Sequence, residues 1–331
     1  MKTLAGFSLI LVIVLVSLSA YLRLAHSGIG CADWPACYGL IGTPAAGADP
    51  AGLPSAAQAG SAYRNLLERS GESMAWATPL HRLVASVLGL AIVFLNMLAW
   101  RQGRHRVIAL ILLGLTVWLA LLGIRSGSLH DPAVVMGNLA GGFAMLALIG
   151  WLRFRLAGPH PVVRSTPPWL TASAIALLSV QIILGGLTSA NFAATACSTL
   201  PDCHGGWWPG PELGEAMDLS RHHEVTPSGR AVGGPERIAI HRAHRIGALL
   251  AGFAALLAGL LACRHRRARV TGGLITLLAV AEFGVGVASV RLDLPIGLAV
   301  AHNWLAGLLL LGLLWLLVIT TRADSTRSAP A

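Results

Sequence analysis

Long apolar stretches separated by short polar segments dominate the chain. Each stretch spans about 17–25 residues, the length that an α-helix needs to cross the hydrocarbon core of a bilayer. The pattern predicts eight transmembrane helices, at residues 6–22, 79–100, 107–124, 132–152, 169–188, 238–263, 270–290 and 296–320. We therefore expect an all-α integral membrane protein. A cleaved signal peptide is the alternative for residues 6–22, but Leu18 fits the small-residue cleavage rule poorly.

The composition agrees with a membrane protein. Only 11% of the 331 residues are charged, against about 25% in an ordinary soluble domain. The net charge of +10 would by itself suggest a nucleic-acid partner, but the basic residues gather at one set of predicted helix ends. They are Lys2, Arg101, Arg104, Arg106, Arg153, Arg155, Arg164, Arg264, Arg266, Arg267, Arg269, Arg322 and Arg327.

Short loops rich in Lys and Arg stay on the cytoplasmic side of a membrane. The distribution therefore predicts a multi-pass protein of a bacterial-type cytoplasmic (inner) membrane, with both termini in the cytoplasm. The loops at about 23–78 and 189–237 then lie outside. The lipid bilayer, rather than nucleic acid, is the expected partner of this charge pattern.

Three landmarks recur in the same order about 165 residues further along the chain. They are Cys31-x5-Cys37 and Cys197-x5-Cys203, His81-Arg82 and His244-Arg245, and Asn138 and His302. The repeat predicts two pseudo-symmetric four-helix bundles, at residues 1–160 and 161–331, related by an axis along the membrane normal. Each bundle can hold a cofactor among its facing helices.

His81 lies at the start of the second predicted span. Thr78 and Pro79 have the pattern of an N-cap and a first helical residue, which puts His81 in the first turn. The positive end of a helix disfavours a charged imidazole, and the neutral form is the one that binds metals.

His244 occupies the place in the second half that His81 occupies in the first. His302 lies seven residues after Pro295, which puts it about 10 Å into the last helix. The two imidazoles are thus expected to face each other at similar depth, where they could ligate a heme iron axially. His241 lies on the same helix face as His244 and is the alternative ligand or a hydrogen-bond partner.

Arg82 and Arg245 lie toward the outer surface, next to the repeated histidines. Arginine binds carboxylates in a forked geometry and would suit two heme propionates. Reaching to the membrane interface is the alternative role for both side chains.

The two cysteine pairs, Cys31 with Cys37 and Cys197 with Cys203, fall in the predicted outer loops. An oxidising compartment favours a disulfide within each pair. A metal site shared with His204 and a redox-active pair are the alternatives.

Glu282 is the acid placed inside a predicted span, about 12 Å from the outer end of its helix and close to the expected depth of His302. It is a candidate proton carrier for catalysis or a hydrogen-bonding group between helices. Gln181 is expected to form a hydrogen bond between packed helices.

Taken together, these motifs resemble the heme A synthase family over nearly the whole chain. The resemblance is carried by Arg23-Leu-Ala-His-Ser-Gly-Ile-Gly-Cys31-Ala-Asp-Trp-Pro-Ala-Cys37, His81-Arg82, Gly185-Gly-Leu-Thr188, Cys197…Cys203-His-Gly, His244-Arg-Ile-Gly-Ala and His302.

The resemblance implies eight spans in two halves and a b-type heme held by His244 and His302. It also implies that the first half, with His81, binds heme O and oxidises a ring methyl group to a formyl group. The product is heme A for cytochrome c oxidase. A heme O synthase and an electron donor or acceptor are the implied partners.

Two positions depart from the family pattern. Asn138 stands where many members have a histidine, so the substrate heme would be five-coordinate or be ligated by His26 or His130. Thr78 stands where many members have a glutamate; Glu68 or Glu72 would then replace that group, with Glu72 as the catalytic candidate.

Two other functions fit the same residues. A diheme b-type electron-transfer protein would hold two hemes between histidine pairs, which Asn138 disfavours. A heme-delivery or oxidase assembly factor would bind heme O or heme A without changing it.

Overall fold

The computed structural model describes residues 1–27, 77–125, 132–158, 163–220 and 234–321. Several of the predicted groups lie outside the described residues. They are Cys31, Cys37, Glu68, Glu72 and His130, together with the side chains of His26 and Thr78.

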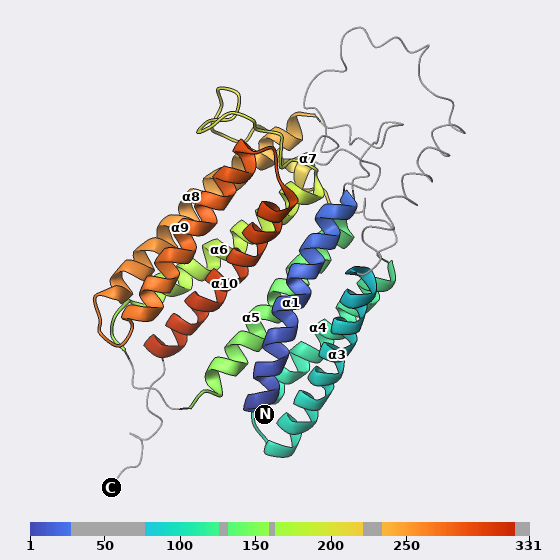
Figure 1. Cartoon of the computed structure of the whole chain (residues 1–331), viewed down its shortest axis with the longest axis vertical. Coiled ribbons are helices and arrows are strands. Elements are labelled where there is room, and N and C mark those ends of the chain that lie inside the picture. Colours follow the sequence, from blue (N-terminus) through green and yellow to red (C-terminus); the bar gives the residue numbers. More distant parts are fainter. Residues whose placement is uncertain (28–76, 126–131, 159–162, 221–233, 322–331) are drawn as a thin grey trace.

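The described residues form long helices (Figure 1). Short turns join α3 to α4, α8 to α9 and α9 to α10, whereas a longer irregular segment follows α6. The helices are α1 (Lys2–Ser27), α3 (Ala77–Gln102), α4 (Arg106–Arg125), α5 (Pro132–Arg155), α6 (Pro168–Ala190), α8 (Pro235–Cys263), α9 (Arg269–Arg291) and α10 (Ile296–Thr321), with the short α7 (Leu213–Met217) in the loop after α6. Eight of them are long and apolar enough to cross a membrane, which confirms the predicted all-α membrane fold. Most of the helices extend beyond the predicted spans, by no more than about a turn and a half at either end.

The start of α3 differs from the sequence prediction. The helix begins at Ala77, so Thr78 lies inside it and is not its N-cap, and Pro79 is in the first turn. Proline is compatible with any first-turn position, because the amide groups there have no acceptor within the helix. The Thr-Pro pattern therefore located the helix end only approximately, and His81 remains close to it.

The helices pack as two groups of four (Figure 1). Helix α1 contacts α3 and α5, and α4 contacts the same two helices, which closes the first group. Helices α6, α8, α9 and α10 form the second group in the same way. Helix α10 also contacts α1 and α5, so it belongs to the second group and borders the first.

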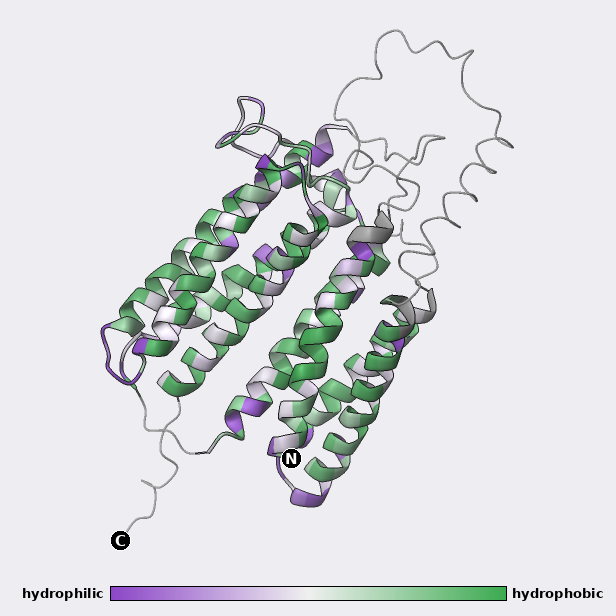
Figure 2. Ribbon diagram, in the orientation of Figure 1, coloured by the Kyte–Doolittle hydropathy of each residue, from purple (hydrophilic) through white to green (hydrophobic). Residues whose placement is uncertain are grey.

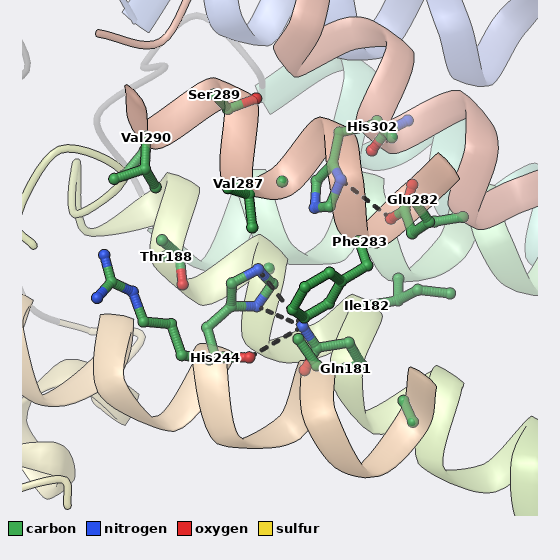
Figure 3. A pocket seen from close by; sticks show the side chains of 18 of the residues that line it. Gln181, Ile182, Thr188, His244, Glu282, Phe283, Val287, Ser289, Val290 and His302 are labelled. Carbon is green, nitrogen blue, oxygen red and sulfur yellow. Dashed lines mark hydrogen bonds and ion pairs between the residues drawn. The ribbon is translucent and has the colours of Figure 1, made fainter. Parts of the chain in front are cut away.

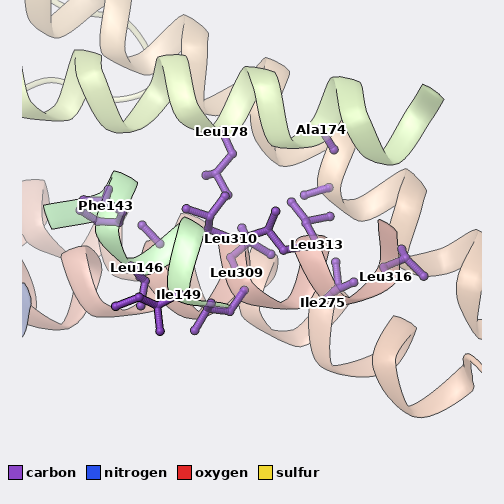
Figure 4. Packing of buried hydrophobic residues seen from close by; sticks show 14 of the residues in the cluster. Phe143, Leu146, Ile149, Ala174, Leu178, Ile275, Leu309, Leu310, Leu313 and Leu316 are labelled. Atoms are coloured by element: carbon purple, nitrogen blue, oxygen red, sulfur yellow. The ribbon is translucent and has the colours of Figure 1, made fainter. Parts of the chain in front are cut away.

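A core of aliphatic side chains fills the boundary between the two groups (Figure 4). Leu146 and Ile149 of α5 pack near Leu178 of α6 and Leu309 and Leu313 of α10. Lipid tails are as apolar as leucine, so close packing rather than water exclusion holds such helices together. This core fixes α10, which carries His302, against the first group.

The surface has the polarity of a membrane-spanning bundle (Figure 2). Hydrophobic residues make up most of the middle of the helices, and hydrophilic residues lie mainly toward their ends and in the turns. The N-terminus and the turns α3–α4 and α8–α9 lie at one end (Figure 1). At this end the Arg106 guanidinium lies 4.8 Å from the Trp100 ring centroid, and that of Arg155 lies 5.8 Å from the Trp151 ring centroid. Arginine over tryptophan is a favourable pair at a membrane interface.

Helices α8 and α9 cross closely near this basic end. A Cβ atom on Gly272 would lie 2.5 Å from the carbonyl oxygen of Gly259 and 2.6 Å from the amide nitrogen of Cys263. Backbone atoms cannot move aside as a flexible side chain can. Gly272 is therefore required for the approach of the two helices, whereas a Cβ atom on the adjacent Gly273 would have nothing within 4 Å.

We predict that Gly272→Ala lowers the thermal unfolding midpoint in detergent, because the added methyl group separates α8 from α9 at a cost of about 1–3 kcal/mol. Gly273→Ala is the matched control and should leave the midpoint unchanged or slightly higher. Equal midpoints for the two variants would show that the helices do not approach this closely.

Candidate functional site

A cavity of about 550 Å³ lies inside the second helix group. Its walls come mainly from α6, α8, α9 and α10, and Phe143 of α5 and Arg23 of α1 add to them. Leu200, Pro201 and Trp207 of the loop after α6 also line it. The volume is in the range of cofactor pockets, which are mostly apolar with a few polar groups.

The structure brings His244 and His302 together in this cavity (Figure 3). Their ring centroids are 6.3 Å apart, and the ring planes are inclined by 80°. A histidine nitrogen lies about 2 Å from a metal that it ligates, so two imidazoles on opposite sides of one metal have ring centres about 6 Å apart. The observed spacing fits a single metal ion between the two rings.

His244 on α8 lies against two residues of α6. The amide nitrogen of Gln181 is 3.0 Å from Nδ1 and 3.4 Å from Nε2 of His244, and it donates a hydrogen bond of 3.0 Å to the His244 carbonyl oxygen. This confirms the predicted bond between helices. One turn later, a Cβ atom on Gly185 would lie 3.2 Å from Cε1 of the ring, so the glycine leaves room for the imidazole.

His302 on α10 lies in the same way against α9. Its Nδ1 is 3.2 Å from Oε1 of Glu282, with 32% of the His302 side chain and 16% of the Glu282 side chain exposed (Figure 3). A Cβ atom on Gly286 would lie 3.2 Å from Cε1 of His302. Glu282 is thus a neighbour of the predicted cofactor histidine and sits in the second helix group, whereas His81 is on α3.

Arg245 is engaged by the loop after α6. Its two terminal nitrogens donate hydrogen bonds of 2.6–2.7 Å to the carbonyl oxygens of Cys197, Thr199 and Asp202. Arg242 adds a bond of 2.7 Å to the Cys203 carbonyl oxygen. The sequence predicted that the Arg245 guanidinium would bind a heme propionate. In the structure it holds this loop at the edge of the cavity.

The sulfur atoms of Cys197 and Cys203 are bonded to each other, with their Cα atoms 4.9 Å apart. His204 is directed elsewhere, because its Nε2 lies 3.1 Å from the Ala196 carbonyl oxygen. Within the part of the chain that the structure describes, no three His, Cys, Asp or Glu side chains gather as a metal site. This geometry favours the disulfide over the alternative of a metal shared by these cysteines and His204.

His241 has a different environment from His244. Its side chain is buried, and its Nδ1 lies 2.8 Å from the Ala193 carbonyl oxygen. This contact ties α8 to the segment after α6. His244, which faces the other cavity histidine, remains the better ligand candidate.

The predicted residues of the first helix group are spread over two helices. His81 is half-buried near the start of α3, Arg82 beside it is exposed, and Asn138 is half-buried on α5. The loop between α1 and α3, which contains Glu72, lies outside the described residues. The described residues thus define the second site more fully than the first.

Sequence reasoning missed three features of the cavity and of the loop beside it. Arg23 reaches it from α1, where its Nη2 lies 3.4 Å from Oδ1 of Asn303. Arg242 directly follows His241, just as Arg245 directly follows His244. This repeated His-Arg order could have identified Arg242 as a second arginine beside the site. In both α6 and α9, a polar residue is followed one turn later by a glycine. Only the packed helices show that each such pair contacts one of the cavity histidines.

The fold and the cavity define a polytopic membrane protein with a pocket among its helices, lined by two facing histidines whose spacing is compatible with one metal ion. Comparison with known protein families identifies the family of this chain. It belongs to the cytochrome oxidase assembly protein (COX15-CtaA) family, whose sequence profile matches residues 2–314.

Individual relatives extend this result. The chain is 30% identical to a heme A synthase of Shewanella oneidensis, over 92% of each protein. It is 25% identical to a heme A synthase of Neorickettsia sennetsu, over 93% of this chain and 95% of the relative. A heme A synthase of Rhizorhabdus wittichii is 32% identical over 49% of this chain and 43% of the relative.

We predict that Arg245→Lys loosens the loop, because a single ammonium group cannot hold three carbonyl oxygens in the way that a guanidinium does. Losing one such bond costs about 1.5 kcal/mol. The Cys197–Cys203 bond should then be reduced roughly tenfold faster by a water-soluble reductant. Mass spectrometry of alkylated Cys197 peptides measures the rate. Arg266→Lys, in the exposed turn between α8 and α9, is the control, and an equal rate in both variants would contradict the role of Arg245.

Proposed function

We propose that this membrane protein is a heme A synthase, which oxidises a methyl group of heme O to a formyl group and so supplies heme A to cytochrome c oxidase. The observation that carries the proposal is the pair of imidazoles 6.3 Å apart in the cavity. The chain also shares 30% identity over 92% of its length with a protein of that name.

The second helix group fits a resident heme b. His244 and His302 would hold its iron from two sides, and apolar residues such as Phe143, Leu178 and Leu309 would surround the macrocycle. Such a heme supplies one-electron transfer. Both imidazoles are held by neighbouring helices, so the protein fixes their spacing in advance of binding.

The cationic groups near the outer mouth of the cavity suit the propionates of such a cofactor. Arg23 and Arg245 both line the cavity. The terminal nitrogens of Arg245 already hold the loop, so a propionate would have to compete with three carbonyl oxygens for them. We therefore expect Arg245 to carry less of the propionate contact than its position in the sequence suggests, with Arg23 sharing it and Arg82 serving the first helix group.

In the first helix group, His81 would bind the iron of the substrate heme O. Asn138 would line that pocket without ligating strongly, because a neutral amide is a weaker ligand for iron than imidazole. Glu72 remains the candidate acid or base near the substrate. The oxidation would proceed in two successive two-electron steps. Overall it would add one oxygen atom from water, release four protons and pass four electrons to an external acceptor, with a heme O synthase supplying the substrate.

The membrane orientation follows from the basic end of the bundle. Arg106 and Arg155 lie over tryptophan rings at the end that also contains the N-terminus. By the preference of basic residues for the cytoplasmic side, we infer a cytoplasmic (inner) membrane protein with both termini inside and the Cys197–Cys203 loop outside.

The function is tested by purifying the protein from cells that make heme O and analysing the extracted hemes. We expect heme B together with heme A or a hydroxylated precursor. His81→Ala should lose the oxidised hemes and keep the heme B of the second site. Heme B alone in the unaltered protein would contradict catalysis, and unaltered heme O would point to a delivery factor.

We predict that His302→Ala abolishes the b-type absorption of the purified protein, because a single remaining imidazole leaves the iron without its second ligand. The pyridine hemochrome spectrum measures how much heme B remains bound. Removing a residue that merely supports a metal ligand lowers metal affinity about 10–100-fold, so removing the ligand itself should lower the bound heme by more than about tenfold. His265→Gln, in the turn between α8 and α9, is the control and should keep full absorption. Retention of the spectrum in His302→Ala would exclude the proposed ligand pair.

A further inference from the structure

The two cavity histidines are held by matching pairs of residues on neighbouring helices. On α6, Gln181 and Gly185 face His244; on α9, Glu282 and Gly286 face His302. In each pair the glycine follows the polar residue by four positions, about one helical turn. The supports of the two imidazoles therefore have the same design, with one chemical difference.

The difference is that His244 has an amide beside it and His302 has a carboxylate. Oε1 of Glu282 is 3.2 Å from Nδ1 of His302. Among the described residues that line the cavity, Glu282 is the sole acid. Oε2 of Glu282 and Nδ1 of His302 are both buried without a hydrogen-bond partner within the described part of the chain. The approach of Oε1 to Nδ1 is thus an ion-pair contact, and it places the carboxylate beside the imidazole.

A carboxylate inside a membrane-spanning bundle is costly, and such groups usually serve a functional site. Positions 278 and 279 on the same helix are apolar, as are Phe283 and Val287 near the cavity. An aliphatic or amide side chain at position 282 would fill the same space at lower cost. The negative charge itself is therefore the property that needs an explanation.

A carboxylate that accepts the Nδ1 proton of an imidazole leaves Nε2 free for a metal and makes the ring a stronger electron donor. Electron donation by an axial ligand, and negative charge near the iron, favour the oxidised state of a heme over the reduced state. An amide in the same position orients the ring with much less of this effect.

We propose that Glu282 is a positioning residue that lowers the reduction potential of the heme held between His244 and His302. This inference rests on the proposed function of the cavity. Gln181 is a neutral neighbour of His244, whereas Glu282 is a charged neighbour of His302. We therefore expect His302 to be the more strongly electron-donating of the two ligands. A lower potential makes the cofactor heme a better donor to the next electron acceptor.

The test is a potentiometric titration of the purified heme-loaded protein, followed at the b-type absorption band. Glu282→Gln keeps the shape of the side chain and removes its charge, so the midpoint potential should rise while the spectrum of a heme with two histidine ligands is kept. Glu215→Gln on α7 makes the same chemical change outside the cavity and should leave the potential unchanged. A role of Glu282 in packing alone would not move the potential.

An unchanged potential in Glu282→Gln would overturn the proposal, and so would the loss of the two-histidine spectrum, which would mean that the carboxylate holds the ring rather than tuning it. If Glu282→Gln is not recovered from membranes, Glu282→Met gives the same measurement with an apolar side chain of similar length. It also removes the charge, so the midpoint potential should again rise; no rise would overturn the inference. A protein that binds no heme b at all would instead refute the proposed function.

Discussion

Polar side chains inside an apolar helix bundle need partners from neighbouring helices, because neither lipid nor a dry core can solvate them. The cavity of this protein is built around that constraint. His244 and His302 each lie against a polar group of the next helix, and Gly185 and Gly286 give the rings the space to do so. The spacing of the imidazoles is therefore a property of how four helices pack, and α8 and α9 also approach each other closely at Gly272, nearer the basic end.

The same constraint explains the loop that borders the cavity. Carbonyl groups in a short irregular loop have no partners in a helix or sheet, and buried carbonyls are costly when unpaired. Arg245 and Arg242 supply donors to this loop from α8. Because Arg245 directly follows His244, the loop and the imidazole are attached to the same turn of one helix. The site and its outer cover are thus positioned together.

Much of this arrangement could be predicted from the sequence. The spans follow from hydropathy, and the shared depth of Glu282 and His302 follows from a constant rise per residue. The hydrogen-bond partners of individual side chains were harder to predict. The role of Arg245 depends on how residues 197–203 turn back onto α8, and the reach of Arg23 depends on the packing of α1 against α10. Neither is encoded in the local pattern of apolar and polar positions. The end of α3 was misplaced because Thr78 and Pro79 are compatible with several first-turn positions.

Helix α10 has contacts with α1, α5, α6 and α9, and it carries one of the two facing imidazoles. Chains enter the membrane from their amino-terminal side during synthesis. The other helices of both groups are therefore inserted while the wall formed by α10 is still missing. The pocket can acquire its second imidazole only after residues 296–321 have left the ribosome. Closure of the pocket between the two rings is thus a late event in biogenesis, and until then the inner faces of α6 and α9 are exposed to lipid or to another protein.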